Sequence, residues 1–393
     1  MTTDYERILL AEGIGYSEIL DPKFKTKIFF TQPLSAATAA GSALATSLLT
    51  ASNQRYPSIA QLRKKLQMLY GAAIFGSVQR EGDIQTNHIS ATVIDDSYAL
   101  EQEPLFDEVL ELLLDCLFRP NAADGAFSQT EFRIRQQNLL DTIKAEIDEK
   151  RTYALNQARR TAFDGEPAAL SPCGTAEEVA ALTPASAYAA YQELLRTAGI
   201  EIYFVGPAKK AGLADKLRRA FAAIPDRKPQ PLCAIAPSPA KPEPQEVHEL
   251  LPVAQCKLVL LWKTAYENPW VLAMLSAVFG GTPSSKLFAN VREKMSLCYY
   301  CAASYSTFKQ SLNSRTWKKH ETPSSSSCGR SSRATSRRRS WKTPRCPSTT
   351  PSMALAIRRR PISTGTSDSS AKASPCRRTN STKSTSPSRS LSW

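Results

Sequence analysis

Side chains that commonly bind a catalytic zinc ion are few and far apart in this chain. Its three histidines are His88, His248 and His320, and no two of them are close in sequence. A hydrolytic zinc site needs about three protein ligands and an open position for water. Histidine spacing therefore predicts no such site. His88 falls on the polar side of a predicted strand, where we expect its imidazole to face solvent.

Two short motifs superficially suggest other chemistry. Cys298 and Cys301 have the C-x-x-C spacing of metal and redox sites. We predict a strand there, and residues three apart on a strand point to opposite faces, so neither use is predicted. Gly280–Lys286 faintly resembles a phosphate loop, but it lacks the Gly-Lys-Ser/Thr ending and follows a helix instead of a strand. A nucleotide site is therefore not predicted either.

Arg292 and Tyr299 are the remaining candidates for chemistry. A guanidinium and a phenol are good hydrogen-bond donors to the negative charge that develops on oxygen during peptide hydrolysis. By spacing alone, a surface arginine on a helix and an aromatic residue in the core are the simpler interpretations. Their role depends on the elements that position them and on the sequence around them.

Alternation and helical periodicity predict that residues 1–222 form one α+β domain. Ile200, Ile202 and Phe204 alternate with more polar neighbours, as a strand with one buried face does. Ser58 precedes an amphipathic helix and Ser128 a longer one, each with a predicted capping box. We expect strands within residues 13–33, 72–79, 84–94 and 200–206, and helices within residues 34–51, 58–71, 105–117, 128–164 and 184–196. The expected fold is a mixed, mostly antiparallel sheet with helices on one face.

A second domain of the same kind is predicted to begin after a linker. Residues 223–247 are rich in proline, which makes an extended, semi-rigid connection. Residues 248–308 then repeat the pattern, with strands expected at 256–262 and 298–305 and helices beginning at Pro269 and Lys286. About 60 residues are too few for a whole domain of this kind. We therefore expect the second domain to be truncated.

The composition changes abruptly near residue 309. Residues 309–393 contain 34 Ser and Thr and have 19 Lys and Arg against Glu321 and Asp368, a net charge of +17. Such a segment buries too little apolar area to offset its chain entropy, so we expect it to be disordered. A shifted reading frame explains the change, and we favour it because the break falls in mid-domain. A genuine Arg/Ser tail that binds nucleic acid is the alternative.

Charge and cysteine usage restrict the partners of the rest of the chain. Outside residues 309–393 there are 31 basic and 34 acidic side chains, so this part is near neutral and gives nucleic-acid binding no support. No apolar run approaches the ~20 residues that span a bilayer, so we expect no membrane association. The nine cysteines are scattered, which suits a reducing cytoplasm.

The segment around the Gly-Gly turn carries a specific resemblance to a known family. It comprises Phe279–Phe288 (FGGTPSSKLF), Val291–Lys294 (VREK) and Ser296–Tyr299 (SLCY). The chain resembles the insulinase, pitrilysin and mitochondrial-processing-peptidase family in four features. These are the Gly-Gly turn, the Ser-x-Leu-Phe motif, the Arg-Glu-x motif and the Tyr seven residues after the Arg. Tyr56-Pro57-Ser58 and Ile202–Gly206 support the likeness, which covers residues 10–308 but not the tail.

The resemblance also implies where a zinc site would lie, and that it is absent. Family peptidases carry H-x-x-E-H on one helix, with the Glu as general base. Counting back from Tyr56-Pro57-Ser58, the positions of the two His and the Glu are occupied by Ala43, Thr46 and Ser47. These residues supply neither useful zinc ligands nor a base. Glu146 lies near the expected third ligand, but one carboxylate cannot hold a metal. We expect no metal, no cofactor, no catalytic residue and no activity of the chain alone.

The resemblance assigns a substrate-binding role to Arg292 and Tyr299. In the family, these two residues reach the zinc site of the partner half, bind substrate and stabilise the tetrahedral intermediate. The chain is similar to the bacterial members that lack the metal motif and pair with an intact, zinc-bearing member to enclose a peptide. The expectation is a noncatalytic subunit of a peptidase heterodimer. A scaffold without a catalytic contribution and a nucleic-acid binder with a basic tail remain the alternatives.

Overall fold

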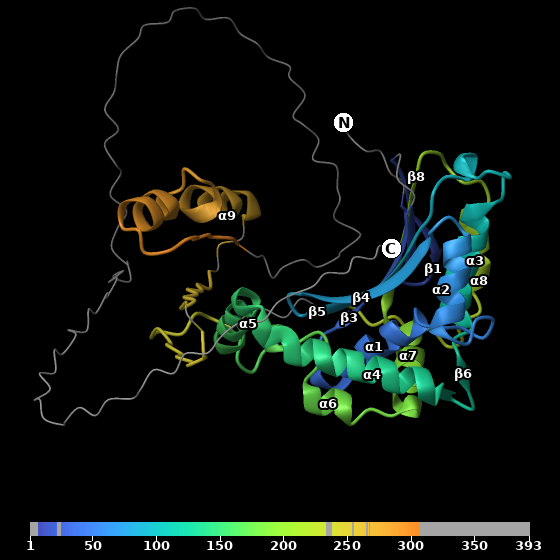
Figure 1. Cartoon of the computed structure of the whole chain (residues 1–393), viewed down its shortest axis with the longest axis horizontal. Helices are drawn as coiled ribbons and strands as arrows, with labels where there is room; N and C mark the ends of the chain where they lie inside the picture. Colours follow the sequence, from blue (N-terminus) through green and yellow to red (C-terminus); the bar gives the residue numbers. More distant parts are fainter. Residues whose placement is uncertain are drawn as a thin grey trace, which may run out of the picture. The chain divides into compact units, whose positions relative to one another are not determined.

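A computed structural model describes residues 7–21, 25–232, 238–253, 255–264, 266 and 268–305. The tail at 309–393 and His320 lie outside the described residues. The main sheet has six strands: β1 (Arg7–Ala11), β2 (Ile14–Leu20), β3 (Lys25–Pro33), β4 (Ala73–Glu81), β5 (Ile84–Thr92) and β8 (Gly199–Gly206). They are ordered β1-β2-β8-β3-β5-β4, and only β2 and β8 run parallel (Figure 1). The predicted mixed, mostly antiparallel sheet is confirmed.

One face of the sheet packs against helices and forms the core. In the register of the central strands, Ile28 lies opposite Ile89 on one side and Ile202 on the other, and all three are fully buried. Burying side chains of this size stabilises a fold by about 1.5–3 kcal/mol each. The Phe204 ring on the same face meets Phe106 edge-on at 5.1 Å between ring centroids. The alternation predicted for residues 200–206 thus marks the helix-facing side of β8.

Eight helices of the described residues belong to this part of the chain. They are α1 (Ala36–Leu49), α2 (Ile59–Met68), α3 (Leu105–Phe118), α4 (Gln129–Lys144), α5 (Lys150–Ala162), α6 (Ala176–Ala180), α7 (Pro184–Thr197) and α8 (Leu213–Phe221). In Figure 1, α1, α4, α6 and α7 lie together on one side of the curved sheet. α1 approaches the sheet closely because its side chains are small and because Gly76 of β4 has no side chain. A Cβ at Gly76 would lie only 2.9 Å from the Thr46 carbonyl oxygen.

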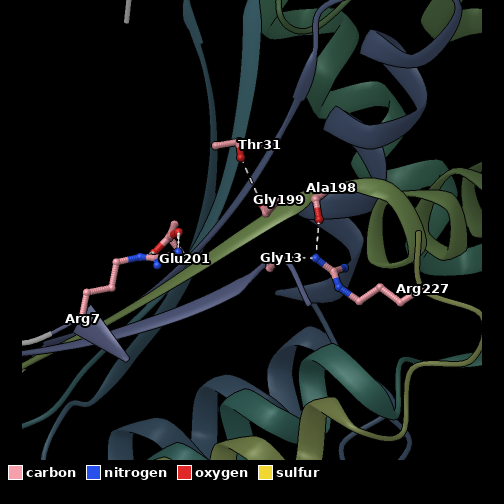
Figure 2. Close-up of polar contacts among 7 residues, drawn as sticks. All are labelled: Arg7, Gly13, Thr31, Ala198, Gly199, Glu201 and Arg227. Carbon is pink, nitrogen blue, oxygen red and sulfur yellow. Dashed lines mark hydrogen bonds and ion pairs between the residues drawn. The ribbon is translucent and has the colours of Figure 1, made fainter. Parts of the chain in front are cut away.

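The polar contacts in Figure 2 fix the strands around β8. Arg7 of β1 donates to both carboxylate oxygens of Glu201, from Nε at 3.1 Å and from Nη2 at 2.5 Å. The Thr31 hydroxyl donates to the Gly199 carbonyl at 3.0 Å.

Arg227 closes the same end of the sheet, although it lies after α8. Its Nη2 donates to the carbonyls of Ala198 at 2.6 Å and Gly13 at 3.1 Å (Figure 2). Its Nη1 donates to the carbonyl of Leu195 at 2.5 Å. Burial lowers the pKa of Arg227 to about 10. Residues just past the predicted boundary at 222 are therefore hydrogen-bonded to the first domain.

The long helix predicted over residues 128–164 is divided in two. A short 3-10 segment, η2 (Ala145–Asp148), separates α4 from α5, and Glu149 leaves the helical conformation with φ −85° and ψ 80°. The Glu149 carboxylate accepts from the backbone N–H of Arg151 at 3.4 Å and so caps α5. The capping box predicted at Ser128 is also wrong, because the Ser128 side chain makes no cap hydrogen bond. No Pro or Gly marks the break in the sequence.

Residues 255–305 contain the predicted helices but not the predicted strands. α9 (Pro269–Ser276) continues into the π-helical η4 (Ala277–Gly281), and a second π-helical segment, η5 (Phe288–Lys294), follows. Neither 256–262 nor 298–305 is a strand. A strand exists through hydrogen bonds to a neighbour, and the described residues supply no partner strand for these two. The boundaries 1–222, 223–247 and 248–308 remain predictions.

Candidate functional site

The helix that would carry a zinc motif instead packs on the sheet. Ala43 and Thr46 of α1 are buried, and Ser47 is half-buried. The Thr46 hydroxyl is hydrogen-bonded within the fold, to the Ser42 carbonyl at 2.8 Å and to Asn87 Oδ1 at 3.2 Å. Alanine offers no donor atom and the threonine hydroxyl is already engaged. These residues therefore do not fit a zinc ion.

Beside these positions, a glutamine network joins α1 to the sheet. Gln32 Nε2 donates to Gln85 Oε1 at 2.7 Å and to Ser42 Oγ at 3.1 Å, and the Ser42 hydroxyl donates to Gln85 Oε1 at 2.8 Å. Gln85 Nε2 in turn donates to the carbonyls of Ala39 at 3.1 Å and Pro172 at 2.6 Å. Because the amide nitrogens of both glutamines are engaged within the fold, this network is structural.

A cavity of about 360 Å³ opens where β4, η2 and α5 approach one another. Its lining residues are mostly polar: Gln79, Arg80, Glu146, Asn156, Arg159, Arg160, Ser171 and Pro172. Glu146 accepts from Asn156 Nδ2 at 2.6 Å, and its other oxygen lies 3.5 Å from Arg160 Nη2. Glu146 thus lies in a polar cavity, where its charged neighbours are arginines and not metal ligands.

The arginines of this cavity are crowded and incompletely paired. Burial lowers the pKa of Arg80 to about 10, with the charge of Arg159 as the second cause. Burial and then Arg160 lower the pKa of Arg159. Arg80 Nη1 donates to the Ala168 carbonyl and Arg159 Nη1 to Asn156 Oδ1. The Nε atoms of Arg80 and Arg159 are buried and have no hydrogen-bond partner in the described part of the chain.

Sequence reasoning named Glu146 but missed these arginines. Asn156, Arg159 and Arg160 have i, i+3 and i, i+4 spacing and share one side of α5, which was a usable local signal. Arg80 joins them only through the fold, from the helix-facing side of β4, opposite Gln85. No local pattern in the sequence predicts that contact.

The structure brings Arg292 and Tyr299 close together. The guanidinium carbon of Arg292 lies 5.9 Å from the centroid of the Tyr299 ring and 4.3 Å from that of Phe288. Tyr299 is 84% exposed, so the alternative interpretation as a core aromatic is wrong. An exposed phenol beside a guanidinium can donate hydrogen bonds to a ligand from outside the chain.

His88 does not face solvent as predicted. It is only 6% exposed, because it packs beside the Phe29 ring with 5.4 Å between ring centroids. Burial lowers the pKa of His88, followed by the charges of Lys27 and Lys25. No group of three or more His, Cys, Asp and Glu side chains suited to a metal ion occurs in the part of the chain that the structure describes.

Cys298 and Cys301 are also arranged differently from the prediction. Burial first and the neighbouring Cys298 thiol second raise the pKa of Cys301. The predicted opposite-face arrangement required a strand, and 298–305 does not form one. Both thiols are free.

Comparisons with known proteins agree with this picture of a peptidase-like fold without a metal motif. A family model described as "Peptidase M16 inactive domain" matches residues 181–318. A Bacillus subtilis (strain 168) protein described as "Probable inactive metalloprotease YmfF" is 26% identical over 304 residues, covering 76% of this chain and 71% of that protein.

Solved structures share the fold. A conserved protein from Enterococcus faecalis V583 aligns with a TM-score of 0.63 and 25% identity, over 78% of this chain and 73% of that chain. The "peptidase M16 inactive domain" from Pseudomonas fluorescens aligns with a TM-score of 0.55 and 14% identity, over 77% and 71% of the two chains.

The fold and the missing ligands define a class, that of peptidase-like proteins without the catalytic metal motif. By these matches, the chain resembles inactive members of the M16 peptidase family. The family resemblance predicted from Phe279–Tyr299 is thereby confirmed. Among the described residues, no helix is both long and apolar enough to cross a membrane.

Proposed function

We propose that this chain is a noncatalytic subunit of a zinc-peptidase heterodimer and contributes Arg292 and Tyr299 to the active site of a zinc-bearing family partner. One observation carries the proposal. The metal motif is replaced by Ala43, Thr46 and Ser47, while Arg292 and Tyr299 are present. The guanidinium carbon of Arg292 lies 5.9 Å from the centroid of the Tyr299 ring. Loss of the ligands removes any reason to keep this pair for chemistry within the chain. An exposed phenol beside a half-buried guanidinium is suited to bind substrate at the site of another subunit.

The proposal is tested by reconstitution. The full-length chain is mixed with a family member that carries H-x-x-E-H, and cleavage of a peptide library is measured. We expect cleavage to require both subunits and to fall about tenfold or more with Arg292→Ala, since loss of one donor to an oxyanion costs roughly 10²–10³ in rate where it is fully used. Lys294→Ala, an exposed change in the same η5, is the matched control. Equal cleavage without this chain would sink the proposal.

The main alternative is a scaffold that makes no contribution to catalysis. It predicts that the chain co-purifies with the zinc-bearing member but that Arg292→Ala leaves cleavage unchanged. Co-purification together with the reconstitution assay therefore separates the two functions.

A cytoplasmic location belongs to the same proposal. The five cysteines that the structure describes are all free, including the adjacent Cys298 and Cys301, as thiols of a reducing compartment are. Fractionation of cells that express the chain tests this location.

We further propose that residues 248–308 begin a second domain and that the reading frame shifts near residue 309. The family match ends at residue 318, close to the change in composition. Resequencing codons 300–393 and translating all three frames tests this. A frame with helical periodicity supports the shift, whereas its absence supports a genuine basic tail. Such a tail would bind nucleic acid with an affinity that falls steeply with salt.

A further inference from the structure

The arginine-lined cavity beside Glu146 has an excess of positive charge. Arg80, Arg159 and Arg160 line it with Glu146 as the only carboxylate, and its other lining residues are neutral. Counting each arginine as +1 and Glu146 as −1, the lining has a formal net charge of +2. The nearby Asp83 acts on Arg80 but is not a lining residue. Like charges confined in one cavity repel one another, so the arrangement is one that an anion would stabilise.

The hydrogen-bonding capacity of the cavity is also unfilled. Glu146 is engaged by Asn156 at 2.6 Å and lies 3.5 Å from Arg160. No ion pair joins it to Arg80 or Arg159, both of which the structure describes. The Nε–H groups of these two arginines are buried without a partner in the same part of the chain. An unsatisfied buried donor costs roughly 1–3 kcal/mol, and a guanidinium fork matches the two oxygens of a carboxylate.

We infer that this cavity binds a carboxylate group of a peptide ligand, either an acidic side chain or a free C-terminus. The inference deepens the proposed function, on which the identity of the ligand as a peptide rests. A cavity of about 360 Å³ admits one side chain or one chain end. The anionic groups of an unmodified peptide are carboxylates, and the two oxygens of a carboxylate match a guanidinium fork.

Three dye-labelled peptides test whether the cavity prefers a carboxylate group. All are heptapeptides of Ala, Ser and Gly: one with a central Glu and an amidated C-terminus, one with a central Gln and a free C-terminus, and one with a central Gln and an amidated C-terminus. Binding to the full-length chain alone is followed by fluorescence anisotropy. We expect at least one carboxylate peptide to bind about tenfold or more tightly than the neutral one, as for a charge-assisted hydrogen bond. Equal affinity of all three would overturn the inference.

Variants identify the cavity as the binding site. Arg159→Gln is expected to abolish the preference for carboxylate. Arg135→Gln is the matched control, because Arg135 also has a buried Nε without a partner in the described part of the chain and a pKa lowered by burial, yet does not line the cavity. We expect Arg135→Gln to retain the preference. Equal loss in both variants would overturn the inference.

Glu146→Gln is expected to strengthen peptide binding, the opposite of the effect expected for Arg159→Gln. Removing the built-in carboxylate relieves repulsion and frees Arg160, so we expect the acidic peptide to bind severalfold more tightly. Unfolding cannot produce such a gain. Unchanged or weaker binding would contradict the inference.

Failure of this inference is distinguishable from failure of the proposed function. The peptide measurements use the chain without a zinc-bearing partner and do not depend on Arg292. If carboxylate peptides show no preference while partner-dependent cleavage still responds to Arg292→Ala, the cavity assignment is wrong and the heterodimer proposal stands.

Discussion

Residues 7–232 have a lower proportion of apolar residues than residues 255–305 but bury far more of them. In the first region, every second side chain of β8 is buried against helices, and strands distant in sequence pair in register. In the second, helices form where predicted, yet Leu258 is 83% exposed and Trp270 82% exposed. Helix hydrogen bonds are local, whereas strands and a core need partner segments. The second region has local structure without a core, and the proposed incomplete second domain accounts for this difference.

Limited proteolysis should give the largest contrast between the two regions. Segments with few buried apolar contacts open at low free-energy cost and are cut first. We expect cleavage within 238–305 at least about tenfold faster than within 7–232, with a fragment near residue 232 persisting. Mass spectrometry of timed digests measures this. A protease-resistant product of full length would contradict the comparison and the proposed incomplete domain together.

A core truncation should separate the regions by stability. Ile28→Ala removes a fully buried side chain between Ile89 and Ile202 and should reduce the free energy of unfolding by about 2–5 kcal/mol. Leu258→Ala, at an exposed position in 255–305, should change it by less than about 0.5 kcal/mol. Urea denaturation followed by circular dichroism measures both. Similar losses in the two variants would mean that Leu258 is buried in solution.

The Arg227 contacts test whether the first region ends at residue 222 or beyond it. Arg227→Gln leaves the carbonyls of Gly13, Leu195 and Ala198 without their donor, which should cost about 1–3 kcal/mol. Arg218→Gln, in an exposed ion pair with Asp215 on α8, is the control and should cost under about 1 kcal/mol. Equal midpoints of urea denaturation for the two variants would place residue 227 in the linker instead.

The smallest expected effect is the pH dependence from His88. Because its pKa is lowered on folding, the unfolded chain binds the proton more tightly. The stability contribution is therefore present above the unfolded value of about 6.5 and is lost as pH falls towards the lower folded pKa. His88→Gln should reduce the difference in unfolding free energy between pH 7.5 and 5.0. The substitution His248→Gln, at an exposed position, should leave this difference unchanged. An equal change in the two variants would contradict burial of His88.

Local patterns were sufficient to predict much of the fold. The alternation at Ile200–Phe204 identified β8, and the helix predicted within residues 34–51 is α1. The break at Glu149 was missed because neither Gly nor Pro marks it. The strands predicted at 256–262 and 298–305 did not form because strand pairing depends on distant segments. Burial of His88 likewise depends on Phe29 of a neighbouring strand.

The candidate site was only partly predictable for the same reason. Replacement of the metal motif by Ala43, Thr46 and Ser47 is a property of the sequence, and so is the spacing of Arg292 and Tyr299. The cavity requires Arg80 of β4 to meet Arg159 and Arg160 of α5. These residues are far apart in the chain, and only tertiary packing brings them together.

The most direct test of the heterodimer account is a titration of the zinc-bearing partner with this chain while the initial rate of peptide cleavage is followed. The account predicts saturation, with Arg292→Ala giving the same half-saturation concentration but a plateau about tenfold or more lower. Such a result would mean that the subunit assembles normally and lacks a group that acts in the transition state. Equal plateaus for wild type and Arg292→Ala would contradict the account and leave a scaffold role.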